Sequence, residues 1–349
     1  MTDMPASPIL LSYARLRQRR KRILSALTLL LVLSVILDLS IGPSGLGLSR
    51  SLAALIGAES ASQGDTVIIH YIRLPQAIAA VLVGAALALA GAEMQSILRN
   101  PLASPFTLGV SAAASLGAAL AFVFGIGLPG LAHMWLVPGN AFVFAFAAVM
   151  LLSLLSHRFG AGTDTLILLG IALVFALNAV VALLQFVASE AALQQFVFWT
   201  MGSISQVSWT QLFILLCALA LCLPFSLAAS NAMTALAFGV DRAASFGVDV
   251  KKLRFFTLLR ISLLASIAVA FVGTIGFVGL VGPHIARLLV GEDHRVFLPA
   301  SLLCGALILS LASLLSKTLI PGVLLPIGVV TSLVGIPVFA VLILRRGKL

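Results

Sequence analysis

The sequence predicts an all-α integral membrane protein with ten transmembrane helices in a single domain, residues 1–349. Hydrophobic residues make up 61% of the 349 residues and charged residues only 9%, and the mean hydropathy is +1.18, as in polytopic helical membrane proteins. Apolar segments of about twenty residues, enough to cross a bilayer, recur along the chain. Basic residues fall mostly between these segments, so the net charge of +10 indicates topology determinants and lipid headgroup contacts, with no nucleic-acid partner.

The N-terminal segment 1–22 is basic and precedes the first expected span, residues 23–39. No convincing small-x-small cleavage site follows this span, so we expect it to be an uncleaved helix with segment 1–22 in the cytoplasm. The cations of the segment are Arg15, Arg17, Arg19, Arg20, Lys21 and Arg22.

The second span, residues 73–95, organises the rest of the chain. Its many glycines and alanines allow neighbouring backbones to approach closely, which predicts a helix packed on all sides. The helix is expected to end before Pro101 and Pro105, because two prolines four residues apart do not fit inside one regular helix.

Eight further spans complete the prediction. They are residues 105–127, 140–157, 165–188, 209–229, 257–277, 278–291, 297–317 and 325–344. The distribution of charge supports the short span 278–291. With ten spans and both termini cytoplasmic, all Lys and Arg residues lie on the cytoplasmic side except Arg50, Arg73 and Lys317. Without it, a basic cluster would lie in the wrong compartment.

An internal repeat is consistent with this topology. The repeat would relate spans two to five to spans seven to ten with inverted topology, as in many transporters. Gly91, Pro101 and Gly109 recur at one constant offset as Gly273, Pro283 and Gly291.

The connection 236–254 between the sixth and seventh spans is expected in the cytoplasm. It should form two short helices broken at Gly239 and Gly247.

No catalytic or metal-binding motif is evident in the sequence. There is no Walker-type phosphate loop, so this chain is not expected to hydrolyse ATP itself. No His–acid set accompanies the Ser and Thr residues, and the three cysteines lie in apolar runs without metal-ligand spacing. His284 and His294 flank Glu292 and Asp293, a pattern that we interpret as a helix cap or an ATPase contact in preference to a metal site.

Several long motifs in order carry a family resemblance. They are RLPQAIAAVLVGAALALAGAEMQ, RNPLASPFTLGVS, FGVDRAASFGVDVKKLR, GTIGFVGLVGPHIARLLVGEDHRVFLPASLLCGA and LPIGVVTSLVGIPVF. The chain resembles the permease subunits of type II bacterial ABC importers for chelated iron and cobalamin. The sequence departs from that family at Gln76, Ser313, Leu325 and Glu93. We expect Glu93, near the inner end of its span, to point to the membrane interface.

The resemblance implies the assembly and the location. It implies a second permease, identical or paralogous, two cytoplasmic ABC ATPases, a periplasmic or lipid-anchored substrate-binding protein, and membrane lipid around them. This chain would bind no cofactor, because ATP and magnesium belong to the ATPase, and it would be no enzyme. It would be a multi-pass protein of the bacterial cytoplasmic (inner) membrane.

The resemblance also implies the roles of particular residues. Phe246, which directly precedes Gly247, would be the apolar anchor of the ATPase contact, with Asp241 and Arg242 at the rim of that contact. The cytoplasmic gate would involve Leu102, Thr163 and Asp164. Arg73 and Lys317, as outer cations, would meet acidic residues of the binding protein.

One face of the fifth span is expected to line the translocation pathway. Asn178 and Gln185 are seven residues apart, so they share a helix face, although an interhelical hydrogen bond would also satisfy their amides. The resemblance adds Thr331 of the tenth span. An iron–siderophore complex is the expected substrate, haem the second choice and cobalamin the third. A secondary transporter driven by ions is the remote alternative, because it would need titratable residues at mid-membrane.

Overall fold

The computed structural model describes residues 8–58, 61–127, 130, 132–158, 163–320 and 322–346, and within them it is helical throughout with no strand. The elements are α1 (Pro8–Ser40), α2 (Leu48–Leu55), α3 (Gln63–Val67), η1 (Ile68–Arg73), α4 (Leu74–Leu98), η2 (Pro105–Leu108), α5 (Val110–Phe124), η3 (His133–Trp135), α6 (Leu136–Arg158), α7 (Thr163–Val187), α8 (Glu190–Thr200), α9 (Trp209–Ala228), α10 (Ser230–Ala237), α11 (Val240–Ser245), α12 (Val250–Val272), α13 (Val278–Val290), α14 (His294–Thr318) and α15 (Ile327–Arg346). The predicted all-α membrane fold is confirmed.

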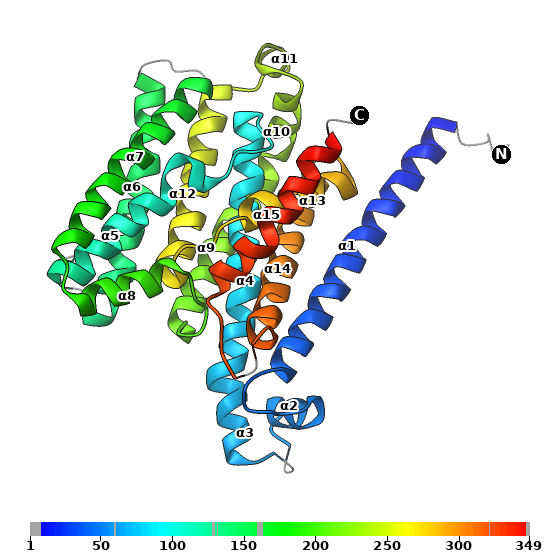
Figure 1. Ribbon diagram of the computed structural model, residues 1–349. Coiled ribbons are helices and arrows are strands. Elements are labelled where there is room, and N and C mark those ends of the chain that lie inside the picture. The colour runs from blue at the N-terminus through cyan, green and yellow to red at the C-terminus, as the bar shows by residue number, and fades with distance from the viewer. Residues whose placement is uncertain are drawn as a thin grey trace.

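Seven described helices are long and apolar enough to cross a membrane, and three shorter apolar helices accompany them. These shorter helices, at Val110–Phe124, Val278–Val290 and Ile327–Pro337, coincide with three of the expected spans. The number of spans and the side on which the termini lie stay predictions. In Figure 1 the start of α1 and the end of α15 lie at the end of the molecule that carries α10 and α11, with α2 and α3 at the opposite end.

Helix α4 is the centre of the fold, as expected from its small residues. Nearly every side chain from Pro75 to Leu98 is buried, and α4 packs on α9, α12, α13 and α14 (Figure 1). A Cβ atom on Gly91 would clash with the carbonyl oxygen of Gly279, so glycine is required for the close approach of α4 to α13. Arg99 adopts a left-handed conformation, with φ 48°, and ends the helix before the two prolines.

Several boundaries differ from the prediction. Helix α1 begins at Pro8, so the described part of the basic segment continues the first span as one helix. The expected span 105–127 divides into η2 and the shorter α5, because Gly109, with φ 87°, separates them. Helix α12 begins seven residues before the predicted start at 257, with Asp249 as its N-cap.

The residues that suggested the repeat do not occupy equivalent places. Gly91 lies inside α4, whereas Gly273 ends α12; the turn after α4 holds Pro101, whereas Pro283 lies inside α13. The order of helix lengths does recur, because α4 to α7 have 25, 15, 23 and 25 residues and α12 to α15 have 23, 13, 25 and 20. An inverted repeat therefore stays a prediction, now supported by lengths instead of by the offset.

Candidate translocation groove and inner gate

A groove of about 470 Å³ lies where η2 and α5, the end of α8, the α12–α13 connection and the start of α15 meet. Its lining combines apolar side chains with hydroxyl groups and contains no charged residue. The lining residues are Phe106, Ser111, Thr200, Met201, Thr274, Gly276, Gly328, Val329, Ser332, Leu333 and Ile336. Such a surface suits a large substrate with a shielded charge better than it suits a bare ion.

Irregular backbone shapes this groove. Between α12 and α13 the chain is not helical, and Phe277 has a φ of 66°, a strained conformation that costs about 1–3 kcal/mol and is typical of functional sites. Thr274 donates a hydrogen bond to the carbonyl oxygen of Thr200, at 2.5 Å, which ties the connection to the end of α8. Irregular backbone at membrane depth is tolerated where it lines a cavity.

The hydroxyl groups of the groove were not identified from the sequence. Ser111, Thr200, Thr274 and Ser332 are short polar residues in otherwise apolar segments. The available signal was their position next to glycines at helix ends, such as Gly109 and Gly273. Without the fold, nothing showed that four separate segments converge.

The three predicted pathway residues are not brought together within the subunit. On α7, Asn178 is exposed and Gln185 is half-buried. Thr331 is buried and donates a hydrogen bond to the carbonyl oxygen of Gly328, while its neighbour Ser332 lines the groove. The pathway role of the three residues stays a prediction.

The connection 236–254, here called the coupling loop, has the predicted form. Gly239 and Gly247 both have positive φ and bound α11. Asp241 and Arg242 are exposed, and 71% of Phe246 is accessible, which leaves an apolar ring available to a partner.

A second exposed aromatic ring lies on this loop. Phe238 is 62% accessible, and it directly precedes the glycine that starts α11. Phe238 was not identified from the sequence. The available signal was that Phe238 and Phe246 lie on either side of one short helix. The loop itself is held by α10, in which Met233 and Leu236 are fully buried.

The gate residues are described only in part. Leu102 is exposed in the turn after α4. The backbone N–H of Leu102 donates a hydrogen bond to the Asn100 side chain, which holds this turn. Helix α7 begins at Thr163, but the side chains of Thr163 and Asp164 lie outside the described residues. Helix α7 packs against η2, since Gly170 lies close to Leu108.

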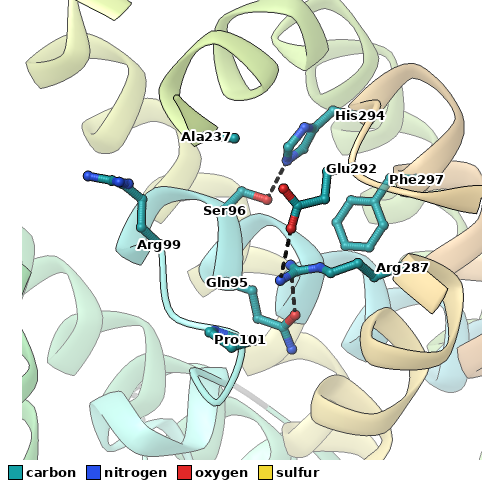
Figure 2. Close-up of a pocket in the computed structure, with 9 residues that line it drawn as sticks. All are labelled: Gln95, Ser96, Arg99, Pro101, Ala237, Arg287, Glu292, His294 and Phe297. Carbon is teal, nitrogen blue, oxygen red and sulfur yellow. Dashed lines mark hydrogen bonds and ion pairs between the residues drawn. The ribbon is translucent and has the colours of Figure 1, made fainter. Parts of the chain in front are cut away.

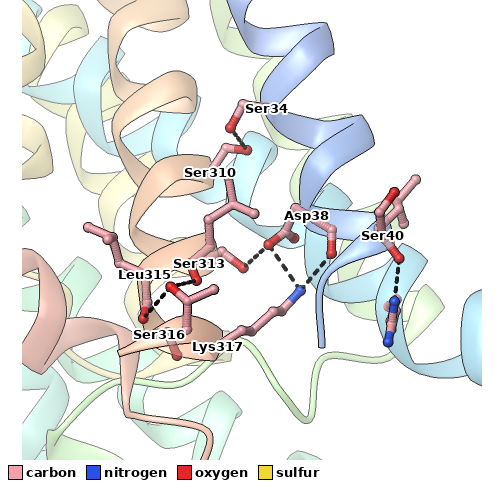
Figure 3. Close-up of polar contacts among 12 residues, drawn as sticks. Ser34, Asp38, Ser40, Ser310, Ser313, Leu315, Ser316 and Lys317 are labelled. Atoms are coloured by element: carbon pink, nitrogen blue, oxygen red, sulfur yellow. Dashed lines mark hydrogen bonds and ion pairs between the residues drawn. The ribbon is translucent and has the colours of Figure 1, made fainter. Parts of the chain in front are cut away.

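The expected exposure of Arg73 and Lys317 is wrong. Only 3% of Arg73 is accessible, and it donates hydrogen bonds to the carbonyl oxygen of Leu39 and to the Ser44 hydroxyl, both at 2.7 Å. Lys317 forms a buried ion pair with Asp38 (Figure 3). Docking of the binding protein at the two cations stays a prediction, without the exposed charge that it assumed.

Glu93 does not point to the membrane interface, as we had expected. Its side chain is completely buried, and its Oε1 atom lies 2.7 Å from Nη2 of Arg260, whose side chain is 11% accessible. Arg260, on α12, also donates to the Thr257 hydroxyl at 3.0 Å. The topology count includes Arg260 among the cytoplasmic cations, although the expected span 257–277 contains it; in the structure it lies inside α12.

A pocket of about 190 Å³ lies beside the C-terminal end of α4 (Figure 2). His294 is buried there and bonds Ser96 and Thr234, so it is not the helix cap; Asp293 caps α14 through its carboxylate. The lining residues are Gln95, Ser96, Arg99, Pro101, Ala237, Arg287, Glu292, His294 and Phe297. Within the described residues, no group of three or more His, Cys, Asp or Glu side chains is placed to hold a metal.

The chain matches the profile of the FecCD transport family over residues 30–345. It is 39% identical to a hemin transport system permease protein of Yersinia pestis over 79% of this chain and 82% of that one. It is 36% identical to a vitamin B12 import system permease protein of Salmonella typhi, over 97% of this chain and 100% of the other. A molybdate import system permease protein of Haemophilus influenzae is 35% identical, over 93% and 97%.

A solved structure has the same architecture. It is described as an inward-facing conformation of a metal-chelate type ABC transporter, and the match has a TM-score of 0.81 at 32% identity. The match covers 93% of this chain and 99% of the other.

Proposed function

Because this chain belongs to the FecCD transport family, we propose that it translocates an iron–siderophore complex as the permease subunit of a type II ABC importer. The family makes the chain a transport permease, with ATP hydrolysis on a separate subunit, and a multi-pass protein of the inner membrane. The substrate is the part that we propose.

The groove without charged lining is the observation that carries the substrate proposal. A siderophore wraps its iron in organic ligand, so the permease meets a large organic surface instead of a bare metal ion. Ser111, Thr274 and Ser332 offer hydroxyls to such a surface, while Phe106 and Ile336 offer apolar contact. Weak contacts of this kind allow a substrate to leave as well as to enter.

Haem and cobalamin are the alternatives within the same class, and relatives of this chain are named for both. Another relative is named for molybdate, a bare oxyanion for which a groove lined by cations would be expected. The uncharged lining favours a shielded chelate over molybdate. A secondary transporter driven by ions is disfavoured by the family, although Glu93 is a buried carboxylate of the kind that it would need.

The proposed assembly contains two permeases, two ATPases and an external binding protein. ABC importer permeases of this kind work as dimers with such partners. We place the ATPase contact on the coupling loop, with Phe246 as the apolar anchor, because an exposed ring at the centre of a contact contributes most of its binding energy. Asp241, Arg242 and Gly247 would surround that anchor.

The inner gate would consist of the turn that carries Leu102 and the start of α7 at Thr163 and Asp164. Helix α7 lies against η2, the helix that follows this turn along the chain. The pathway would run between the two subunits along Asn178, Gln185 and Thr331.

Uptake by a deletion strain tests the substrate. Strains with and without this chain are supplied with labelled ferric siderophore, hemin, cobalamin or molybdate, with the partner subunits present. We expect ferric siderophore uptake to require the chain and the other three to be unaffected. Loss of hemin, cobalamin or molybdate uptake alone would reject the siderophore assignment and name the substrate.

A further inference from the structure

The C-terminal end of α4 carries three polar side chains within four residues, and each bonds a different part of the fold. Glu93 bonds α12, Gln95 bonds α13, and Ser96 bonds the first residue of α14. Buried polar groups in a membrane helix are costly unless they are satisfied. All three are buried and satisfied, so the set is a built feature.

The ion pair between Glu93 and Arg260 is the strongest of these contacts. The guanidinium donates through Nε at 2.9 Å and through Nη2 at 2.7 Å to the same carboxylate oxygen. Helix α4 and α12 therefore cannot slide past each other at this level without separating two charges in a medium of low dielectric constant.

His294 forms a second link, which reaches α10, the helix that leads into the coupling loop. Its Nε2 atom lies 2.7 Å from the Ser96 hydroxyl on α4, and its Nδ1 atom lies 3.1 Å from the Thr234 hydroxyl on α10. The ring is 4% accessible. One imidazole thus joins the first helix of the coupling region to the last turn of α4.

Gln95 supplies the third link. Its amide donates to the carbonyl oxygen of Leu280 at 3.3 Å, and Arg287 donates to its Oε1 atom at 3.2 Å (Figure 2). Both partners lie on α13.

These links connect the coupling loop to the gate turn. Helix α10 precedes α11, and α12 begins at Val250, five residues after α11 ends. Helix α4 ends at Leu98 and leads directly into the turn that holds Leu102. The backbone N–H of Asn100 bonds the carbonyl oxygen of Gln95 at 3.1 Å, so the turn is tied to the same polar segment.

We propose that Glu93, Ser96 and His294 are positioning residues, which transmit movement of the coupling loop to the gate turn 99–104. The proposal rests on the proposed function, in which the ATPase moves the loop. A displacement of α10 and α12 would carry the end of α4 with it through the His294 bridge and the Glu93–Arg260 ion pair. The gate turn would then follow.

The test compares transport with ATP hydrolysis in proteoliposomes that contain the full permease–ATPase complex and the binding protein. The variants are the double substitution Glu93→Leu/Arg260→Leu, which leaves no unpaired charge, the substitution Glu93→Gln, which keeps the shape of the side chain but leaves the Arg260 charge without its partner, and the milder Thr234→Val. Ferric siderophore is the probe. The readout is substrate transported per ATP hydrolysed, with the melting temperature of the complex as a separate measurement.

We expect the double variant to hydrolyse ATP but to transport roughly tenfold less substrate per ATP, within the usual range for coupling between two sites. A smaller loss in the same direction is expected for Glu93→Gln and Thr234→Val. The matched control is Ser34→Ala/Ser310→Ala, which removes a buried hydrogen bond of 2.8 Å between α1 and α14. It should lower the melting temperature without changing the ratio.

The outcomes separate this inference from the proposed function. A ratio unchanged in all three variants, with Phe246→Ala/Arg242→Ala uncoupled, overturns the positioning role and leaves docking at the loop intact. If Phe246→Ala/Arg242→Ala remains fully coupled, the loop does not receive the movement from the ATPase. This result overturns both docking at the loop and the positioning role. If the double Leu variant does not fold, Thr234→Val decides, because it removes one hydroxyl from the His294 bridge and leaves every ion pair intact; an unchanged ratio there rejects the proposal.

Discussion

The ammonium group of Lys317 lies 3.0 Å from a carboxylate oxygen of Asp38, and at most 3% of either side chain is accessible. The pair joins the C-terminal end of α14 to the C-terminal end of α1, and the Ser313 hydroxyl donates to the same oxygen at 2.9 Å (Figure 3). Helix α1 otherwise buries little of its surface in the subunit. The ion pair therefore fixes where the C-terminal end of α1 packs.

Removing one partner of this pair should destabilise the subunit strongly. Lys317→Met leaves Asp38 buried and uncompensated, which costs about 3–5 kcal/mol. The double variant Asp38→Leu/Lys317→Met should recover much of that loss. Thermal unfolding of the purified complex in detergent measures both.

The matched control is Lys252→Gln, which breaks an ion pair with Asp249 in which both side chains are exposed, at 77% and 52% accessible. Its loss should be at most about 1 kcal/mol. Equal stability of Lys317→Met and the wild type would show that the buried pair has no structural role, and would return Lys317 to the docking surface.

Replacing the apolar anchor of the coupling loop should separate ATP hydrolysis from transport. Phe246→Ala/Arg242→Ala removes an exposed ring and a rim charge, and the loss of a central anchor typically weakens a contact by about 2 kcal/mol or more. Uptake should fall while isolated ATPase activity persists. Phe213→Ala, an exposed ring on α9 outside the loop, is the control and should transport normally; unchanged uptake in the loop variant would count against docking there.

The face of α7 that carries the two amides should be accessible to water. In a Cys217→Ser background, which removes the one exposed cysteine of the three, Asn178→Cys and Gln185→Cys should react with aqueous thiol reagents in at least one nucleotide state. Val181→Cys, at a position only 7% accessible, should react slowly. Protection of 178 and 185 in every nucleotide state would reject the pathway role.

The inner gate should close by contact across the dimer. A cysteine pair at Thr163 in the two permeases, once oxidised, should arrest transport while ATP hydrolysis stays detectable, because the loop can still respond to nucleotide. Continued delivery of substrate by crosslinked transporter would place the gate elsewhere. The reduced protein is the control and should recover transport.

Local patterns in the sequence were enough to predict α4 and the coupling loop. The glycines and alanines of α4 predict that the helix is packed on all sides. Gly239 and Gly247 bound α11 because they adopt backbone conformations that glycine adopts most readily. The buried pairs were not predictable in this way. Glu93 and Arg260 are separated by 167 positions, and one sequence contains no record of which distant residues meet.

The same limit applied to the outer cations and to the groove. The sequence suggests an exposed Lys317, because this residue ends an expected span. It suggests no role for Asp38, which is a single acidic residue near the end of the first expected span. Only the packing of α1 on α14 brings the two together. The groove lining comes from four segments, each of which is unremarkable alone.

Filling the groove should block transport without disturbing the fold. Ser332 faces the groove and is half-buried, so Ser332→Trp adds a large side chain to a space of about 470 Å³ that already exists. Gly328→Ala is different, since its new methyl group would clash with the carbonyl oxygens of Met201 and Thr274, and overpacking of this kind costs about 1–3 kcal/mol. We therefore expect Ser332→Trp to keep the melting temperature and basal ATPase activity but to lose ferric siderophore uptake, whereas Gly328→Ala should lower the melting temperature. Ser332→Ala is the control for size: it removes one weak hydroxyl contact without adding bulk, so it should keep most of the uptake. Normal uptake by a folded Ser332→Trp complex would mean that the substrate does not pass through this groove.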